Sequence, residues 1–112
     1  MKTIVKKVGK KAVLADLPDD CKRLSALAEY LEADLASTKI SADTVVIYDK
    51  TATEDRHNVT LGGQEFYGDI LLLGASGAWL KDVDLEIYTN RSLLPALWAK
   101  PKITNEKKEV GT

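Results

Sequence analysis

The sequence CKRLSALAEYLEADL, at residues 21–35, predicts an amphipathic helix. Its apolar residues recur at the spacings of three, four and seven that place side chains on one face of a helix. They are Leu24, Leu27, Ala28, Leu31 and Leu35. Residues 18–20, Pro-Asp-Asp, supply a break and candidate N-caps, because an Asp oxygen accepts hydrogen bonds from the amides of a first helical turn. The helix is therefore the element around which the rest of the fold is predicted.

Two strand-forming runs precede this helix. They span Thr3–Val8 and Lys11–Leu17, and Gly9 lies between them. Glycine adopts the positive φ that a tight connection requires. The pattern predicts an antiparallel hairpin at the start of the chain.

Short strand-forming runs also follow the helix. Residues 36–43 are polar and are predicted to form a connection. The next β-branched, aromatic and apolar runs are Thr44–Tyr48, Asn58–Leu61, Phe66–Leu73 and Ala78–Leu80, separated by a polar loop at 50–57 and by glycine-containing turns. We predict an α+β fold in which an antiparallel sheet of about four to six strands forms a meander and packs against the helix.

The C-terminal part of the chain leaves one element undecided. Val83, Leu85 and Ile87 alternate as in a strand, whereas Leu80, Val83 and Ile87 also share one helical face behind a possible cap at Asp82. Ser92 is predicted to cap a short C-terminal helix over 93–98. Residues 100–112 are polar and predict a flexible tail, so we expect a single domain over residues 1–99.

The charge of the chain is unevenly distributed. Sixteen Lys and Arg nearly balance seventeen Asp and Glu over 112 residues. Residues 12–99, however, contain seven basic side chains against fifteen acidic ones, a net charge of −8, whereas the two ends together carry +7. An acidic body attracts basic partners and repels nucleic acid. Direct nucleic-acid binding is therefore not expected, since a domain that reads DNA is usually more basic.

Few residues are available for catalysis or metal binding. One Cys and one His exclude an internal disulfide and a zinc site of four Cys or of two Cys and two His. Cys21 lies near the predicted helix start, but no spacing brings His57 to it, and Asp19 and Asp20 oppose a thiolate. The glycines match neither a phosphate-binding loop nor a dinucleotide-binding motif. We expect no catalytic residue, no metal and no cofactor.

The sequence contains no recognisable targeting segment. The basic start is followed by only a few apolar residues before Asp16, too few for the apolar core of a signal peptide. The longest apolar run, Ile70–Leu73, is far below the roughly 20 residues that cross a bilayer. We expect a cytoplasmic protein that does not enter a membrane.

The order of these motifs resembles a known protein family. An N-terminal hairpin and one helix are followed by a strand at 45–49, RHNVTL at 56–61 and YGDI at 67–70. Over residues 2–90 this pattern resembles the proteins of phages, plasmids and Gram-positive bacteria grouped as domain of unknown function 3846. The corresponding positions are Asn58, the pair Gly68-Asp69 and the region 80–87, while the helix lacks the Gly-Gly-Tyr-Ile-Glu ending common in that family. The resemblance implies a mobile-element accessory protein and no known active site.

Three hypotheses for function follow. The first is a non-enzymatic binding protein that blocks a host defence protein, of the anti-CRISPR or anti-restriction type. Its acidic side chains would face a basic nucleic-acid-binding groove, with Trp98 as an apolar anchor; the acidic candidates are Asp43, Asp49, Glu54 and Asp55. The alternative is a small-ligand or nucleotide-binding domain with a pocket near Arg56, His57 and Asn58. The third is an enzyme of low activity that uses Cys21 or His57. A homodimer and a monomer are both compatible with the sequence.

Overall fold

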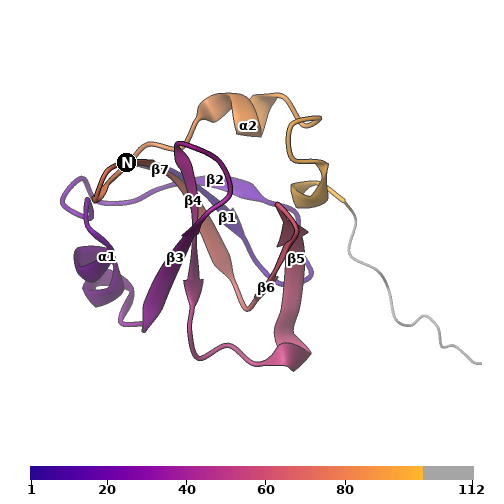
Figure 1. Ribbon diagram of the computed structural model, residues 1–112, viewed down its shortest axis with the longest axis horizontal. Helices are drawn as coiled ribbons and strands as arrows, with labels where there is room; N and C mark the ends of the chain where they lie inside the picture. The colour runs from indigo at the N-terminus through magenta and orange to yellow at the C-terminus, as the bar shows by residue number, and fades with distance from the viewer. Residues whose placement is uncertain (100–112) are drawn as a thin grey trace, which may run out of the picture.

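An antiparallel sheet forms the centre of the computed structural model, which describes residues 1–99 (Figure 1). Five strands lie side by side in the order β2 (Val13–Asp16), β1 (Lys2–Lys6), β7 (Ile70–Ser76), β4 (Thr44–Asp49) and β3 (Leu35–Lys39), and β8 (Trp79–Lys81) pairs with the end of β7. The predicted α+β class with an antiparallel sheet is therefore confirmed. The tail predicted for residues 100–112 lies outside the described residues.

The central strand of the sheet is β7, and this position corrects the predicted meander. Its sequence ILLLGAS is mostly buried, as expected for a strand with neighbours on both sides. Leu72 pairs with Ile4 of β1 on one side and with Val46 of β4 on the other. The N-terminal hairpin is confirmed, because β1 pairs antiparallel with β2. Strands that are consecutive in the sequence are therefore not adjacent at the centre of the sheet, because β7 lies between β1 and β4, which come much earlier in the chain.

The helix α1 (Leu24–Leu31) is shorter than the predicted 21–35. It ends at Glu32, which adopts a left-handed conformation with φ of 53° and donates its backbone N–H to the carbonyl groups of Ala28 and Glu29. A left-handed residue of this kind commonly terminates helices, although glycine is the usual occupant. Leu35 therefore begins strand β3 instead of the last helical turn, and residues 36–39, predicted as a polar connection, belong to that strand.

A second, two-stranded sheet consists of β5 (His57–Leu61) and β6 (Gln64–Tyr67), joined through Gly62 and Gly63. The prediction of one strand over 66–73 is wrong, because Gly68 and Asp69 separate β6 from β7. Gly68 has a φ of 72°, which a β-strand does not accommodate. The chain therefore turns there from the small sheet into the large one.

The segment that the sequence left undecided is helical. Asp84 caps α2 (Leu85–Thr89) by accepting a hydrogen bond from the backbone N–H of Glu86 at 3.0 Å. Asp82, the expected cap, instead accepts the backbone N–H of Lys2. Two short 3-10 helices complete the described chain, η1 (Glu54–Arg56) and η2 (Pro95–Leu97). The short C-terminal helix is confirmed as η2, but Ser92 donates to Asn90 and does not cap it.

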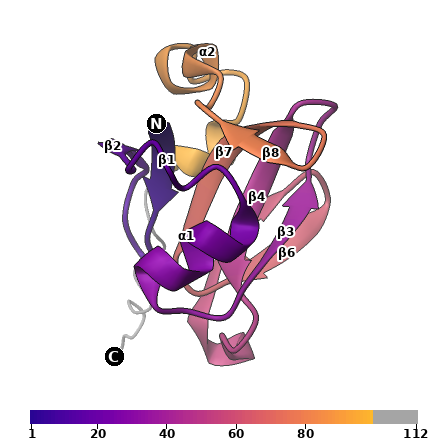
Figure 2. The same cartoon turned by 90° about the vertical axis from the view of Figure 1, so that its left-hand side faces the viewer.

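The two faces of the large sheet bury separate apolar clusters. On one face α1 covers the sheet, as Figure 2 shows, and Leu27 packs with Val45, Ile47 and Leu73. On the other face the β5–β6 hairpin, α2 and η2 supply Val59, Leu61, Phe66, Ile87 and Leu97 to a cluster with Ile4, Val46, Ile70 and Leu72. Alternation along β4 explains the division, since successive side chains of a strand point to opposite faces. The sheet thus lies between a helical layer and a mixed layer.

Candidate functional site

Three aspartates lie at one end of the large sheet. The register pairs Leu35 with Asp49 and Tyr48 with Ile70. Asp34 before β3, Asp49 at the end of β4 and Asp69 before β7 therefore lie at the same end of three adjacent strands. The sequence does not show this common position, because it depends on antiparallel pairing between distant segments.

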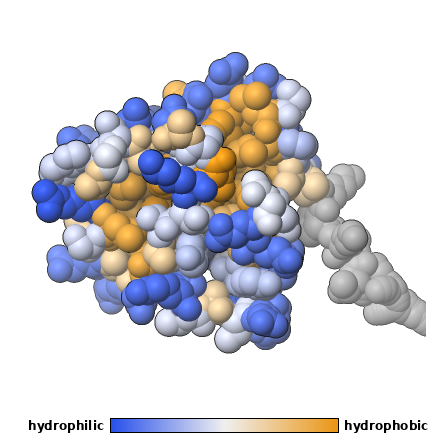
Figure 3. Space-filling model, viewed as in Figure 1, coloured by the Kyte–Doolittle hydropathy of each residue, from blue (hydrophilic) through white to orange (hydrophobic). Residues whose placement is uncertain are grey.

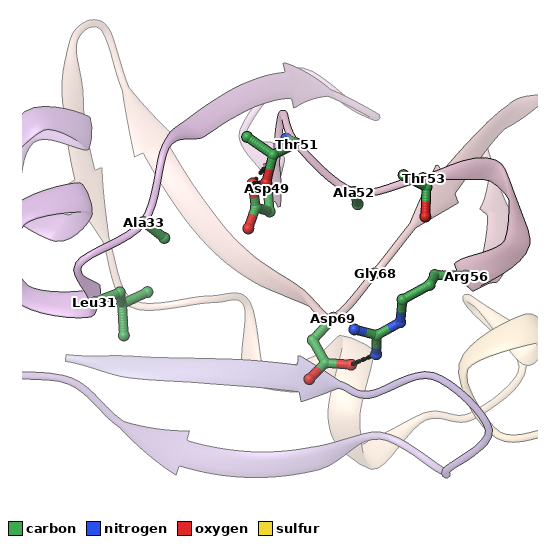
Figure 4. A pocket seen from close by; sticks show the side chains of 9 residues that line it. All are labelled: Leu31, Ala33, Asp49, Thr51, Ala52, Thr53, Arg56, Gly68 and Asp69. Atoms are coloured by element: carbon green, nitrogen blue, oxygen red, sulfur yellow. Dashed lines mark hydrogen bonds and ion pairs between the residues drawn. The ribbon is translucent and has the colours of Figure 1, made fainter.

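A cleft of about 490 Å³ opens at this end, between α1 and the connection from β4 to η1 (Figure 4). Its apolar lining residues are Leu31, Ala33 and Ala52, and its polar ones are Asp49, Thr51, Thr53, Arg56 and Asp69; Gly68 also lines it. We call this space the cleft. It lies where α1, the sheet and the connection from β4 to η1 approach one another, and Arg56, one of the three residues predicted for a ligand pocket, is in its wall.

Asp49 is held by its own loop. Its Oδ1 atom accepts the backbone N–H of Thr51 at 2.8 Å and the hydroxyl of Thr51 at 2.7 Å. These hydrogen bonds lower the pKa of Asp49, because they stabilise the ionised carboxylate. Asp49 therefore presents a fixed negative charge to the cleft at neutral pH.

Arg56 and Asp69 form the opposite side of the cleft. The guanidinium Nη2 atom of Arg56 lies 3.8 Å from Asp69 Oδ1, which also accepts the backbone N–H of Val8 at 3.0 Å. The backbone N–H of Gly68 donates to the carbonyl group of Arg56 at 2.8 Å. This bond ties η1 to the turn that contains Asp69, and it fixes the width of the cleft on this side.

Asn58 has a structural position behind the cleft. Its amide nitrogen donates to the carbonyl groups of Lys6 at 2.7 Å and Gly68 at 2.8 Å, and its Oδ1 atom accepts the Lys6 ammonium at 2.8 Å. Burial lowers the pKa of Lys6, while the negative charge of Asp69 opposes that shift. Asn58 thus connects β5, β1 and the Gly68 turn instead of lining the cleft.

His57 lies on the exposed side of the small sheet. Its Nε2 atom is 3.6 Å from Glu65, and its ring meets the ring of Tyr67 edge-on at 5.5 Å between centroids. Of the three residues predicted for the ligand pocket, the structure therefore places Arg56 alone in the wall of the cleft.

The four predicted acidic residues divide between two ends of the molecule. Asp49 lies in the cleft wall, and Glu54 and Asp55 are exposed in η1 beside it. Asp43 lies at the other end of β4, where its carbonyl group accepts the backbone N–H of Ala75 at 2.9 Å. Three of the four residues can share one surface, and Asp43 belongs to another.

Trp98 lies away from the cleft, beside η2. It is half-buried, its ring meets the ring of Tyr88 at 5.4 Å between centroids, and the guanidinium of Arg91 lies 4.7 Å above it. Its indole N–H is buried and has no hydrogen-bond partner among residues 1–99. Trp98 thus packs against the core margin, at a distance from the acidic residues that it was predicted to accompany.

Cys21 and His57 lie in different layers of the fold. Cys21 is buried in the cluster under α1, while His57 belongs to the hairpin on the opposite face of the sheet. Burial and the neighbouring Asp20 raise the pKa of the Cys21 thiol. In the part of the chain that the structure describes, no group of three or more His, Cys, Asp or Glu is placed to hold a metal ion.

The proximity of Asp69, Thr51 and Thr53 in the cleft wall was not predicted from the sequence. The one available signal was the Gly68-Asp69 pair, because a glycine before a polar residue marks a sharp turn. Residues of the cleft come from the end of α1, the end of β4 and three separate connections, so their proximity depends on strand order.

A scan of protein-family models, a search of curated proteins and a search of solved structures found no match to this chain. The resemblance to domain of unknown function 3846 therefore stays a prediction. Among residues 1–99, none of the helices has the length and apolar character needed to cross a membrane.

Proposed function

We propose that this chain is a non-enzymatic binding protein whose acidic residues engage a basic, nucleic-acid-binding surface of a partner protein. The observation that carries the proposal is a group of acidic side chains in the cleft, in η1 beside it and in a neighbouring hollow that shares Ala33 with the cleft. It consists of Glu29, Glu32, Asp34, Asp49, Glu54 and Asp55, which we call the acidic rim. Two basic side chains in the same region, Lys50 and Arg56, each lie within ion-pair distance of an aspartate.

The distribution of polarity supports the choice of this end. In Figure 3 the end of the molecule that carries η1 is mainly hydrophilic, whereas apolar surface gathers near α2 and η2. Exposed Leu85 lies in α2, and exposed Leu93 lies in the connection between α2 and η2. Complementary charge speeds association and selects partners of opposite sign. A basic groove that normally holds phosphates is the protein surface that best complements the acidic rim.

The biological setting that we propose comes from the resemblance to mobile-element proteins. In that setting the protein acts in the cytoplasm and blocks a host defence protein, such as a nuclease or an RNA-guided effector. Occupation of its basic groove by the acidic rim would exclude nucleic acid, because both bind the same positive charges.

The test compares two charge reversals of equal size. Glu54→Lys with Asp55→Lys changes the acidic rim, and Asp43→Lys with Glu86→Lys makes the same change of charge at the opposite end, near the β3–β4 turn and α2 (Figure 1). Both variants and the unchanged chain are used to capture proteins from a host lysate, with mass spectrometry as the readout. We expect a specific partner that the rim variant loses and the control retains.

Equal capture by both variants would contradict this proposal. A partner that also dissociates at moderate salt and competes with single-stranded nucleic acid would support it, because exposed charge pairs are screened by ions. Folding of both variants is checked by circular dichroism.

A second candidate function is small-ligand binding, and the volume of the cleft favours it. About 490 Å³ lies within the range of ligand pockets. A nucleotide fits the lining less well than a cationic ligand, because Asp49 and Asp69 repel phosphate. Native mass spectrometry of the purified chain should show a discrete added mass if such a ligand remains bound.

A further inference from the structure

The cleft combines an apolar wall with two carboxylates that each have one oxygen available. Figure 4 shows Leu31 and Ala33 on one side, Asp69 and Arg56 on the other, and Asp49 between them. The hydrogen bonds and the ion pair at Asp49 and Asp69 all use Oδ1. Within residues 1–99, the Oδ2 atoms of both carboxylates therefore remain for a ligand.

A long cationic side chain matches this arrangement. Lysine and arginine carry an aliphatic stem that packs on apolar surface and a charged head that seeks carboxylates. The apolar wall would contact the stem, while Asp49 and Asp69 would bind the head. A guanidinium suits two separate carboxylates better than an ammonium does, because its planar fork directs five N–H groups to fixed positions.

We propose that the cleft receives an arginine side chain of the partner protein. The inference rests on the proposed function and names the contact at its centre. An arginine that enters the cleft, with the acidic rim beside it, has the form of a binding hot spot, in which one anchor contributes more than the surrounding contacts. The acidic rim steers the basic surface toward this end, and the cleft then selects the residue that enters.

Arg56 does not occupy the place of the incoming side chain. Its guanidinium is 3.8 Å from Asp69 Oδ1, a long separation for an ion pair, and it lies on the side away from Leu31. Asp69 compensates its charge, and Asp49 is left to compensate the charge of the guest. The guanidinium groups of Arg56 and of the partner's arginine would thus share Asp69. Asp49 and the acidic rim would supply the negative charge that balances the second guanidinium group.

The first experiment uses three short peptides that differ only in the side chain of the middle residue. Acetyl-Gly-Arg-Gly-amide, its lysine counterpart and its citrulline counterpart are titrated into the ¹⁵N-labelled chain. Citrulline keeps the shape of arginine and lacks its charge. We expect the arginine peptide to shift the amide signals of Thr51, Ala52 and Asp69, with weaker shifts for lysine and none for citrulline. Equal shifts for arginine and citrulline would overturn the inference.

The second experiment uses three variants with the arginine peptide. Asp49→Asn keeps an oxygen for the hydrogen bonds from Thr51 and removes the charge, Ala33→Leu fills the apolar wall, and Asp43→Asn is the matched control at the far end of β4. Asp49→Asn should weaken the peptide about fivefold, since a partly exposed charge-assisted contact of this kind contributes modestly. Ala33→Leu should weaken it at least as much, and Asp43→Asn should leave it unchanged.

The captured partner separates failure of this inference from failure of the proposed function. Loss of the partner by the Glu54→Lys/Asp55→Lys variant, with full retention by Asp49→Asn and Ala33→Leu, would overturn the arginine contact and leave the acidic rim intact. Retention by all variants would overturn both. Tight binding of free L-arginine without any effect of the cleft variants on the partner would assign the guanidinium to a small molecule and would also overturn the inference.

Discussion

Asn58 provides the sharpest test of how the two sheets are joined. Its amide group makes three hydrogen bonds, two to the carbonyl groups of Lys6 and Gly68 and one from the Lys6 ammonium. Substitution Asn58→Ala removes all three and leaves Lys6, which is 5% exposed, without a side-chain partner. We expect the free energy of unfolding to fall and the β5–β6 hairpin to loosen from β1.

The magnitude follows from the bonds that are lost. Each amide-to-carbonyl bond contributes about 1 kcal/mol and the bond from the ammonium about 2 kcal/mol. Asn58 is half-buried, so water can replace part of the lost hydrogen bonding. We therefore expect the free energy of unfolding to fall by about 3 kcal/mol. Urea denaturation followed by circular dichroism and tryptophan fluorescence measures it.

Thr60→Ala is the matched control for this prediction, because Thr60 is exposed on the same strand. It should cost less than about 1 kcal/mol, the span of strand propensity. A double-mutant cycle with Lys6→Met should show coupling between Lys6 and Asn58 of about 1–2 kcal/mol. If Asn58→Ala costs no more than Thr60→Ala, or if the cycle shows no coupling, the role that we assign to Asn58 is refuted.

Three further predictions concern the cleft and the core. Gly68→Ala should lower the free energy of unfolding by about 2–3 kcal/mol, because φ is 72° and the new Cβ would lie 2.9 Å from Cβ of Ala52. Gly77→Ala is the control, since φ is 61° there but no atom lies within 4 Å of the new Cβ, and it should cost about 1 kcal/mol. Chemical denaturation of both variants compares the two losses. Folding lowers the pKa of Asp49, so the stability that its carboxylate contributes is present above about pH 4 and is lost as the pH falls through the native pKa. The free energy of unfolding of Asp49→Asn should therefore fall less steeply with acid than that of the unchanged chain. Identical acid-titration curves would contradict this. Cys21, buried and with a raised pKa, should react slowly with Ellman's reagent in the native chain and rapidly in denaturing urea.

The fold class could be predicted because local patterns of polarity match the elements that form. The β-branched run at 44–48 becomes a buried strand, and the leucines at 24, 27 and 31 occupy one helical face. The predicted end of α1 was wrong for a local reason. Leu35 continues the helical spacing from Leu31, and Glu32, which ends the helix, lacks the glycine signature of a left-handed cap.

Strand order could not be predicted, because it depends on pairing between distant segments. The apolar run from Phe66 to Leu73 looks like one strand, yet the turn at Gly68 assigns its halves to different sheets. The same limit applied to the cleft. Arg56 was named from its local sequence, whereas Asp69 and Leu31 reach the cleft through tertiary packing.

The central place of β7 also has a consequence for synthesis on the ribosome. Ile4 pairs with Leu72, so the inner edge of β1 has no strand beside it until most of the chain has been made. At about 5–20 residues per second the N-terminal hairpin waits for several seconds with an open edge. During that interval it is exposed to pairing with other nascent chains, a hazard of uncovered strand edges. Chains interrupted before residue 70 lack the strand that joins β1 to β4, and they should depend on chaperones or be degraded.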